Sequence, residues 1–201
     1  MGHPRLAAGD LPLDQKYMKC IRMYMKEVDW HHAPLHRFVP GRVHMITGAT
    51  LQKRHLFRDA SGLSLMRDLL LERLGECGWE PRAWACLSNH YHVLALSPEV
   101  GDLTRLIRGF HSKLSIALNK RDRTPGRRVM YQFWDRCITY ENGYFARLNY
   151  VMHNPVKHGV VEDARVYPFC SARWFRETQT PAFCRRVASY GTERVNEPDD
   201  F

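Results

Sequence analysis

The sequence lacks several features that would place it in a common class. No apolar run is long enough to cross a membrane, and the N-terminus has no apolar core of a signal peptide. The six cysteines are scattered and none form a Cys-x-x-Cys pair, which argues against a zinc ribbon and a thioredoxin-like redox site. Internal repeats, low-complexity tracts and an ATP-binding motif are also absent. We therefore expect a cytoplasmic protein with reduced thiols that is not membrane-bound.

The composition predicts a globular domain with a strong positive charge. The chain has 201 residues, of which 44% are hydrophobic, and its mean hydropathy is −0.46. This length suffices for one domain with a real core plus extensions. The formal net charge is +9 and the pI is about 9.4. A basic chain of this kind favours a polyanionic partner, with nucleic acid ahead of an acidic membrane surface.

The stretch at residues 88–93 (SNHYHV) holds two histidines separated by one bulky residue. Because a strand places alternate side chains on one face, we expect His90 and His92 to point the same way, about 7 Å apart. Tyr91 is expected on the other face. Two imidazoles held in this way can bind one divalent cation. Taken alone, the pattern is equally compatible with two ordinary strand histidines.

Hydrophobic periodicity predicts short strands interleaved with three helices. The predicted strands cover residues 42–50, 82–87, 90–97 and 133–140, with a bulge at Gly48 and a connection at Ser88-Asn89. The predicted helices cover residues 61–76 with Ser61 as N-cap, residues 102–120, and residues 143–154 with Pro155 as the stop. This order predicts an α+β domain with helices packed on a mostly antiparallel sheet.

The third predicted helix carries Tyr150 and Asn154, four residues apart and so on one helical face. A tyrosine can act as a nucleophile through its phenolate, although its usual pKa of about 10 makes it weak at neutral pH. A nearby cation that polarises a phosphate makes its phosphorus easier to attack, so that a weaker nucleophile suffices. The Asn154 amide oxygen can supply a third, hard ligand suited to Mg²⁺ or Mn²⁺. Spacing does not choose Tyr150 over Tyr140 or Tyr144, and a tyrosine with its ring in the core is the alternative.

Basic residues gather in a loop and on a helix face. The loop at residues 120–128 is the densest cationic segment, and Tyr131, Phe133 and Trp134 follow it closely. Cations beside stacking rings suit a single-stranded or hairpin nucleic acid. A solvated loop and a solvated helix face are the alternatives. The candidate phosphate contacts are Arg105, Arg108, Arg121, Arg123, Arg127 and Arg128.

Three motifs together resemble one protein family. Residues 89–93 (NHYHV) are similar to the His-hydrophobic-His signature of the single-tyrosine HUH transposases, and Asn-His-hydrophobic-His is its form in the REP-associated tyrosine transposases. Residues 150–161 (YVMHNPVKHGVV) resemble the catalytic-helix motif of that branch, and residues 133–136 (FWDR) resemble the Trp-containing strand before it. The resemblance covers roughly residues 30–175. The chain departs from the family pattern at Lys157-His158, where Arg-Ala is usual, and neither His153 nor His158 has an assigned role.

The resemblance implies a fold, a site and a reaction. It implies a ferredoxin-like, RRM-like HUH endonuclease fold over residues 41–163. Residues 1–40 are then an N-terminal extension with a short helix at residues 15–26, and residues 164–201 are a tail that packs back and ends frayed. His90 and His92 would hold a Mg²⁺ or Mn²⁺ ion, with Asn154 where related enzymes have glutamine. Tyr150 would attack single-stranded DNA beside a hairpin, in a bacterial cell.

The product implied is a 5′-phosphotyrosine with a free 3′-hydroxyl, formed by a monomer or by a homodimer that exchanges tyrosine helices. Two other readings stay open at this point. A DNA-hairpin-binding protein of the same fold, with catalysis lost or domesticated, is the main alternative. A zinc site built from Cys86, His90 and His92 is the other, and it requires a turn at Ser88-Asn89 to bring the three side chains together.

Overall fold

One of the two inner strands of the sheet is β1, Val43–Thr50, whose eight residues are all buried. The computed structural model describes residues 38–193, 195–197 and 199. Strand β1 pairs on one side with β3, His90–Leu96, and on the other with β4, Met130–Cys137. Strand β2, Glu80–Cys86, pairs with β3, so the order is β2-β3-β1-β4 with every pairing antiparallel. The predicted antiparallel sheet is therefore confirmed.

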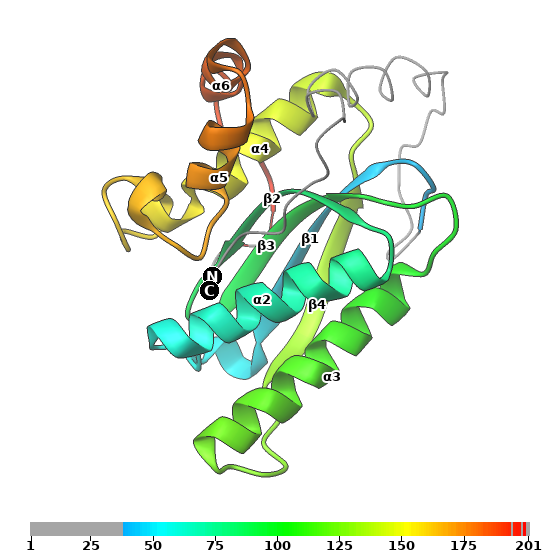
Figure 1. The fold of residues 1–201 in the computed structure, drawn as a ribbon, viewed down its shortest axis with the longest axis vertical. Helices are drawn as coiled ribbons and strands as arrows, with labels where there is room; N and C mark the ends of the chain where they lie inside the picture. The colour runs from blue at the N-terminus through cyan, green and yellow to red at the C-terminus, as the bar shows by residue number, and fades with distance from the viewer. Residues whose placement is uncertain (1–37, 194, 198, 200–201) are drawn as a thin grey trace.

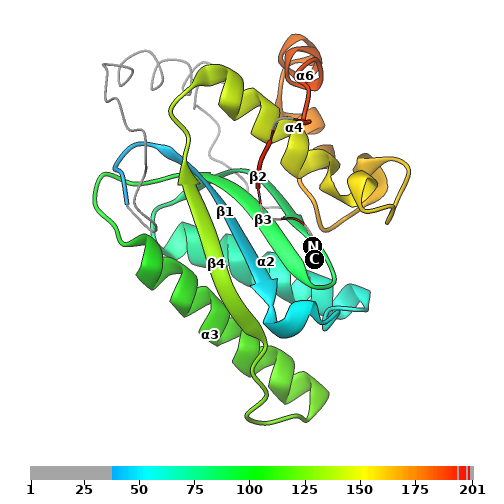
Figure 2. The same ribbon diagram turned by 180° about the vertical axis from the view of Figure 1, so that it is seen from behind.

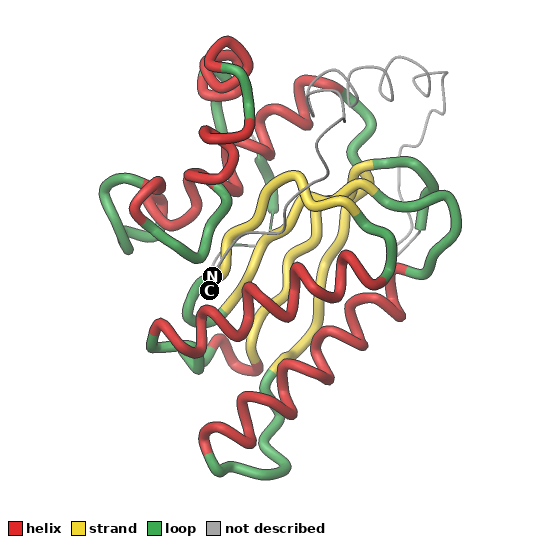
Figure 3. The backbone as a smooth tube through the Cα atoms, in the orientation of Figure 1, coloured by secondary structure: helices red, strands yellow, loops and turns green. Residues whose placement is uncertain are grey.

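Two helices cover one face of this sheet (Figure 1). Helix α2 spans Ala60–Glu76 and helix α3 spans Leu103–Asp122, and the two pack side by side across the strands (Figure 3). The predicted N-cap Ser61 is wrong, because Asp59 accepts the backbone N–H of Gly62 at 2.7 Å, while Ser61 donates its hydroxyl to Asp59. The order β1-α2-β2-β3-α3-β4 is that of a ferredoxin-like α+β domain, as expected.

Helix α4, Glu141–Lys157, lies on the opposite face of the sheet, against β2 and β3 (Figure 2). The prediction that Pro155 stops this helix is wrong. Pro155 lies in the last turn, where its missing N–H costs one hydrogen bond, and the His158 N–H still reaches the Asn154 carbonyl at 3.0 Å. The helix therefore continues to Lys157, two turns beyond Tyr150.

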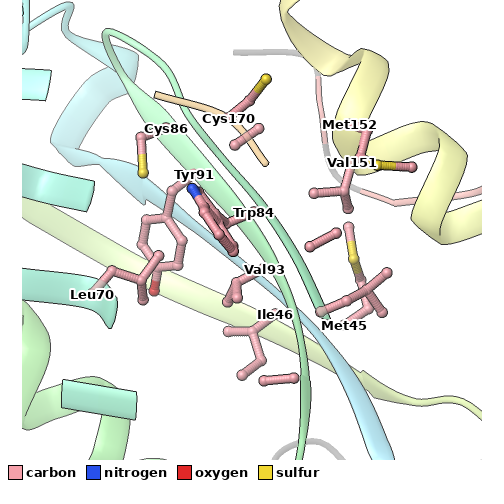
Figure 4. Close-up of a cluster of buried hydrophobic side chains, with 14 of the residues drawn as sticks. Met45, Ile46, Leu70, Trp84, Cys86, Tyr91, Val93, Val151, Met152 and Cys170 are labelled. Carbon is pink, nitrogen blue, oxygen red and sulfur yellow. The ribbon is translucent and has the colours of Figure 1, made fainter. Parts of the chain in front are cut away.

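Side chains alternate across β3 as expected for a strand. Tyr91 packs edge-on against Phe110 of α3, with ring centroids 5.3 Å apart. Its neighbours in the sequence, His90 and His92, point to the α4 side, since His92 pairs with Thr47 and contacts Tyr150. Figure 4 shows the same division, with Tyr91 and Leu70 on one side of the strands and Met45, Val151 and Met152 on the other. The site thus lies between the sheet and α4.

The predicted bulge at Gly48 is confirmed. The register of β1 against β4 shifts between Gly48 and Thr50. A Cβ atom at Gly48 would lie 2.4 Å from Cε1 of Tyr91, so only glycine lets the Tyr91 ring lie flat against the strand.

The segment after α4 continues with a short 3-10 turn, η2 (Ala164–Val166), and two short helices, α5 (Ala172–Thr178) and α6 (Pro181–Ala188). Both η2 and α6 contact α4, and Cys170 bridges to Ala85 along the outer edge of β2. The helix predicted at residues 15–26 lies outside the described residues. Among the described helices, none has the length and apolar character needed to span a membrane.

Candidate functional site

The two histidines of β3 lie side by side on the face that α4 covers. His90 and His92 are both buried, with ring centroids 5.0 Å apart. Burial lowers the pKa of His90, and it lowers the pKa of His92 to about 4. Both imidazoles are therefore neutral near physiological pH, which is the form that binds a metal.

Each histidine uses its second ring nitrogen in a short hydrogen bond. His92 Nδ1 lies 2.7 Å from Thr47 Oγ1, and His90 Nδ1 lies 2.8 Å from Asn89 Oδ1. These bonds leave the two Nε2 atoms directed toward α4. Outer partners of this kind orient the imidazoles that bind metals in proteins.

Helix α4 brings Tyr150 next to this pair. The ring of Tyr150 packs edge-on against His92, with centroids 5.5 Å apart, and its hydroxyl lies 3.5 Å from Lys157 Nζ. The two competing tyrosines lie elsewhere on the same helix. Tyr140 is its exposed N-cap residue, and Tyr144 is buried against Phe145, where burial raises its pKa. Tyr150 is therefore the tyrosine that the structure places at the histidine pair, within one chain.

The residue that sequence reasoning missed is Asp199. Its carboxylate is buried, and its Oδ1 lies 2.9 Å from His92 Nε2 and 3.3 Å from His90 Nε2. The expectation that the chain ends frayed does not hold for Asp199. No local signal could have found it, because it stands in a short polar segment with no motif and meets His92 across 107 positions of the sequence.

The groups around Asp199 stabilise the ionised form of its carboxyl. Burial alone would raise the pKa of this carboxyl, but hydrogen bonds to the two strand histidines and to Lys157 outweigh burial and hold its pKa well below the usual range. Asn154, fully buried on α4, donates Nδ2 to Asp199 Oδ1 at 3.1 Å and to Oδ2 at 3.3 Å. Asn154 Oδ1 is buried, and the Asn154 side chain also interacts with His90.

The structure separates the two histidines that the sequence left without a role. His158 lies in the site, with its ring centroid 4.9 Å from that of His90 and Nε2 2.9 Å from Asp199 Oδ1. His153 is exposed, and its Nδ1 lies 3.1 Å from the Asn149 carbonyl oxygen one turn earlier.

The buried group formed by His90, His92 and Asp199 can hold a metal ion. Their ligand atoms lie within 4.8 Å of one another. Two imidazole nitrogens and one carboxylate oxygen suit a divalent transition ion and fit Mn²⁺ better than Mg²⁺, which prefers oxygen alone. A zinc site that includes Cys86 does not form. Cys86 pairs with Tyr91 and so lies on the other face of the sheet, and burial raises the pKa of its thiol.

The six candidate arginines fall into three groups. Arg121 and Arg127 are held in ion pairs with Asp122, at 2.8 and 2.7 Å. Arg123 and Arg128 are exposed in the loop before β4. Arg105 and Arg108 are exposed on α3, the helix that covers the face opposite the histidines.

The loop before β4 reaches the end of the sheet at which the histidine pair begins. Met130, the first residue of β4, pairs with Thr50 of β1, and the adjacent Ala49 pairs with His90. The structure therefore brings Arg123 and Arg128 toward the His90 end of the sheet and leaves Arg105 and Arg108 on the far layer.

Fold and site together define a ferredoxin-like domain with a buried His-His-Asp group that can hold a metal ion, and with a tyrosine on the facing helix. Comparison with protein-family models gives no match. Among curated proteins, the chain is similar to the REP-associated tyrosine transposase of Escherichia coli (strain K12), with 26% identity over 107 residues. The match covers 52% of this chain and 61% of the relative, so it spans about three fifths of that protein.

Among solved structures, the fold is similar to that of a REP-associated tyrosine transposase bound to a REP hairpin. The TM-score is 0.61 at 20% identity, and the match covers 73% of this chain and 86% of that one. The resemblance that the three motifs indicated, to the REP-associated tyrosine transposases, is thus confirmed by a sequence relative and by a shared fold.

Proposed function

We propose that this chain is a metal-dependent single-stranded DNA endonuclease and strand transferase of the HUH transposase type. The observation that carries the proposal is the position of Tyr150 beside His90 and His92, on a separate element of the same chain. A nucleophile on a helix and metal ligands on a facing strand form the two halves of one site. Homology to a REP-associated tyrosine transposase supports this class of DNA-acting enzyme.

In the proposed reaction, the Tyr150 hydroxyl oxygen attacks a DNA phosphorus and the 3′-oxygen of the preceding nucleotide leaves. A 5′-phosphotyrosine bond forms as the P–O3′ bond breaks, and the proton lost by the phenol ends on the 3′-oxygen. Attack by a 3′-hydroxyl on the phosphotyrosine reverses the step and joins strands. The phosphotyrosine retains the bond energy, so the reaction needs no ATP.

The residues around Tyr150 have distinct roles in this proposal. His90 and His92 would hold a divalent cation, Mn²⁺ or Mg²⁺, with the amide of Asn154 beside them. When bound, such a cation polarises the phosphate and offsets its charge in the transition state. Lys157 holds a positive charge beside the attacking oxygen. The buried walls around the histidines exclude water from the phenol.

The proposed substrate is a DNA hairpin with a single-stranded flank, in the bacterial cytoplasm. A net charge of +9 favours such a polyanion, and the similar solved structure is bound to a REP hairpin. Because one chain supplies both halves of the site, a monomer can complete it, and we expect a monomer rather than a dimer that exchanges α4. DNA contacts are assigned first to Arg123 and Arg128.

A covalent adduct tests the enzyme directly. The protein is incubated with Mn²⁺ or Mg²⁺ and a pool of labelled hairpin oligonucleotides whose single-stranded flanks are randomised, so that an unknown site is represented. Denaturing gels then detect DNA that stays with the protein. We expect an adduct with the native chain, none with Tyr150→Phe, and an undiminished adduct with Tyr140→Phe, which alters an exposed tyrosine on the same helix.

The same experiment separates the alternative, a hairpin-binding protein without catalysis. Retention of the hairpin pool on the native protein under native conditions, with no adduct in either metal, would favour that alternative. An adduct that survives Tyr150→Phe would instead show that another residue is the nucleophile.

A further inference from the structure

Asp199 brings a carboxylate into the histidine site from the far end of the chain. Its side chain is 3% exposed, and its Oδ1 faces the Nε2 atoms of both strand histidines. We propose that Asp199 is the third protein ligand of the cation that His90 and His92 hold, and that Asn154 positions this carboxylate rather than binding the cation. The inference rests on the proposed function for the presence of a cation, but it does not require DNA cleavage.

The hydrogen bonds of Asn89 identify the neutral form of His90. Asn89 donates its Nδ2 to the Lys53 carbonyl at 3.3 Å, so its Oδ1 is the atom that faces His90 Nδ1. An amide oxygen can only accept a hydrogen bond, and His90 Nδ1 must therefore carry the proton. In a neutral imidazole the lone pair then lies on Nε2, the atom directed at Asp199.

A cation can join this nitrogen to the carboxylate. His90 Nε2 lies 3.3 Å from Asp199 Oδ1, and both side chains are buried. A divalent ion between the two atoms would be bound by a neutral imidazole and by a carboxylate oxygen.

The spacing of the ligand atoms also fits one ion. Two ligands at right angles, each about 2.1 Å from a cation, lie about 3 Å apart. Asp199 Oδ1 lies 2.9 Å from His92 Nε2 and 3.3 Å from His90 Nε2, close to that value. His92 can present its Nε2 lone pair as well, because its Nδ1–H can donate to Thr47 Oγ1 at 2.7 Å.

A carboxylate would balance part of the charge of a divalent ion in this site. Two neutral imidazoles and an amide contribute no negative charge, and a buried divalent ion without one is costly. Asp199 supplies that charge. Its Oδ2 accepts from Lys157, which leaves Oδ1 for the histidine side of the site.

Asn154 is placed to hold the carboxylate. Its Nδ2 contacts both oxygens of Asp199, at 3.1 and 3.3 Å, which fixes the carboxylate plane. A residue in this position tunes a metal site without being a ligand, and its removal weakens binding by roughly tenfold to a hundredfold.

Metal binding to the full chain, without DNA, tests the assignment. Binding of Mn²⁺ is measured by the loss of the free-ion EPR signal, and the ligand set is followed by the visible spectrum of bound Co²⁺. We expect Asp199→Asn to raise the Kd for Mn²⁺ about a hundredfold or more and to change the Co²⁺ spectrum, and Asn154→Ala to raise it about tenfold. Glu193→Gln, which changes an exposed acid in the same segment, should leave both unchanged.

The outcomes separate this inference from the proposed function. A Kd for Asp199→Asn within tenfold of native, or a smaller loss than in Asn154→Ala, overturns the ligand assignment even if His90→Ala abolishes binding. Binding that depends on Asp199 without any DNA adduct would instead uphold the ligand and overturn the cleavage reaction. Melting without metal checks folding of each variant, and a Mn²⁺-dependent rise in Tm gives a second measure of affinity.

Discussion

Lys157 Nζ lies 3.5 Å from the hydroxyl oxygen of Tyr150 and 5.0 Å from the centre of its ring. The two residues are seven positions apart, so the contact exists only because α4 continues through Pro155. An ammonium group at this distance stabilises negative charge on the phenolic oxygen as it attacks. The last turn of α4 thus places the Lys157 ammonium where it can stabilise the charge on the Tyr150 oxygen.

Replacing Lys157 should therefore slow adduct formation without removing it. The side chain is 53% exposed, so solvent screens its charge and we expect Lys157→Met to lower the single-turnover rate roughly tenfold rather than a hundredfold. Lys157→Arg keeps the charge and should retain most of the rate. Rates are measured at saturating Mn²⁺, since Lys157 also contacts Asp199. Equal rates for native and Lys157→Met would remove Lys157 from the mechanism.

Hairpin binding should depend on the loop before β4 more than on the outer face of α3. The double variant Arg123→Ala/Arg128→Ala removes two exposed charges at the His90 end of the sheet, while Arg105→Ala/Arg108→Ala removes two from the opposite layer. Both variants lower the net charge equally. We expect the first pair to weaken binding roughly tenfold and to reduce the salt dependence by about two ions, and the second to change little. Fluorescence anisotropy over a salt series measures the affinity for the hairpin and its salt dependence. Equal losses of affinity in the two double variants would mean that binding depends on net charge alone.

The predictable half of the site is the half with a local signature. The shared face of His90 and His92 follows from strand alternation, and that of Tyr150 and Asn154 follows from helical spacing, because both periodicities act within a few residues. The choice of Tyr150 among the tyrosines came from the family resemblance. The order of strands and helices along the chain also has a local signature, because it follows from the hydrophobic periodicity of each segment. The bulge predicted at Gly48 is found as a shift in the register of β1 against β4 between Gly48 and Thr50.

Long-range contacts explain what the sequence did not reveal. Asp199 meets His92 across 107 positions, and nothing local distinguishes it from other acids in the tail. The extent of α4 was missed because a proline in the last turn costs only one hydrogen bond, which packing against β2 and β3 offsets. Arg121 likewise forms an ion pair with Asp59 at 3.0 Å, across 62 positions of the sequence.

The close approach of Tyr91 to the bulge makes Gly48 a sensitive position for stability. Gly48→Ala would put a Cβ 2.4 Å from the Tyr91 ring, which must then shift within a packed core. We expect the free energy of unfolding to fall by about 1–3 kcal/mol, as in overpacked cores. Gly75→Ala in α2 is the matched control, because no atom lies within 4 Å of its added Cβ and helix propensity predicts a gain of up to about 1 kcal/mol. Urea unfolding of both variants measures the difference.

His111 should make the protein less stable in acid. Its Nε2 lies 2.9 Å from the Tyr91 hydroxyl oxygen, and burial lowers its pKa to about 4. An unfolded chain, with a histidine pKa of about 6.5, binds this proton where the folded chain does not. The contribution of His111 to the free energy of unfolding is therefore fully present above about pH 6.5. It falls as the pH drops toward 4, by at most about 3 kcal/mol.

Urea unfolding between pH 4.5 and 7.5 should show a free energy of unfolding that depends less steeply on pH for His111→Gln than for the native chain. Buried His44, His90 and His92 contribute in the same direction in both proteins. Parallel slopes would mean that His111 keeps its proton when folded.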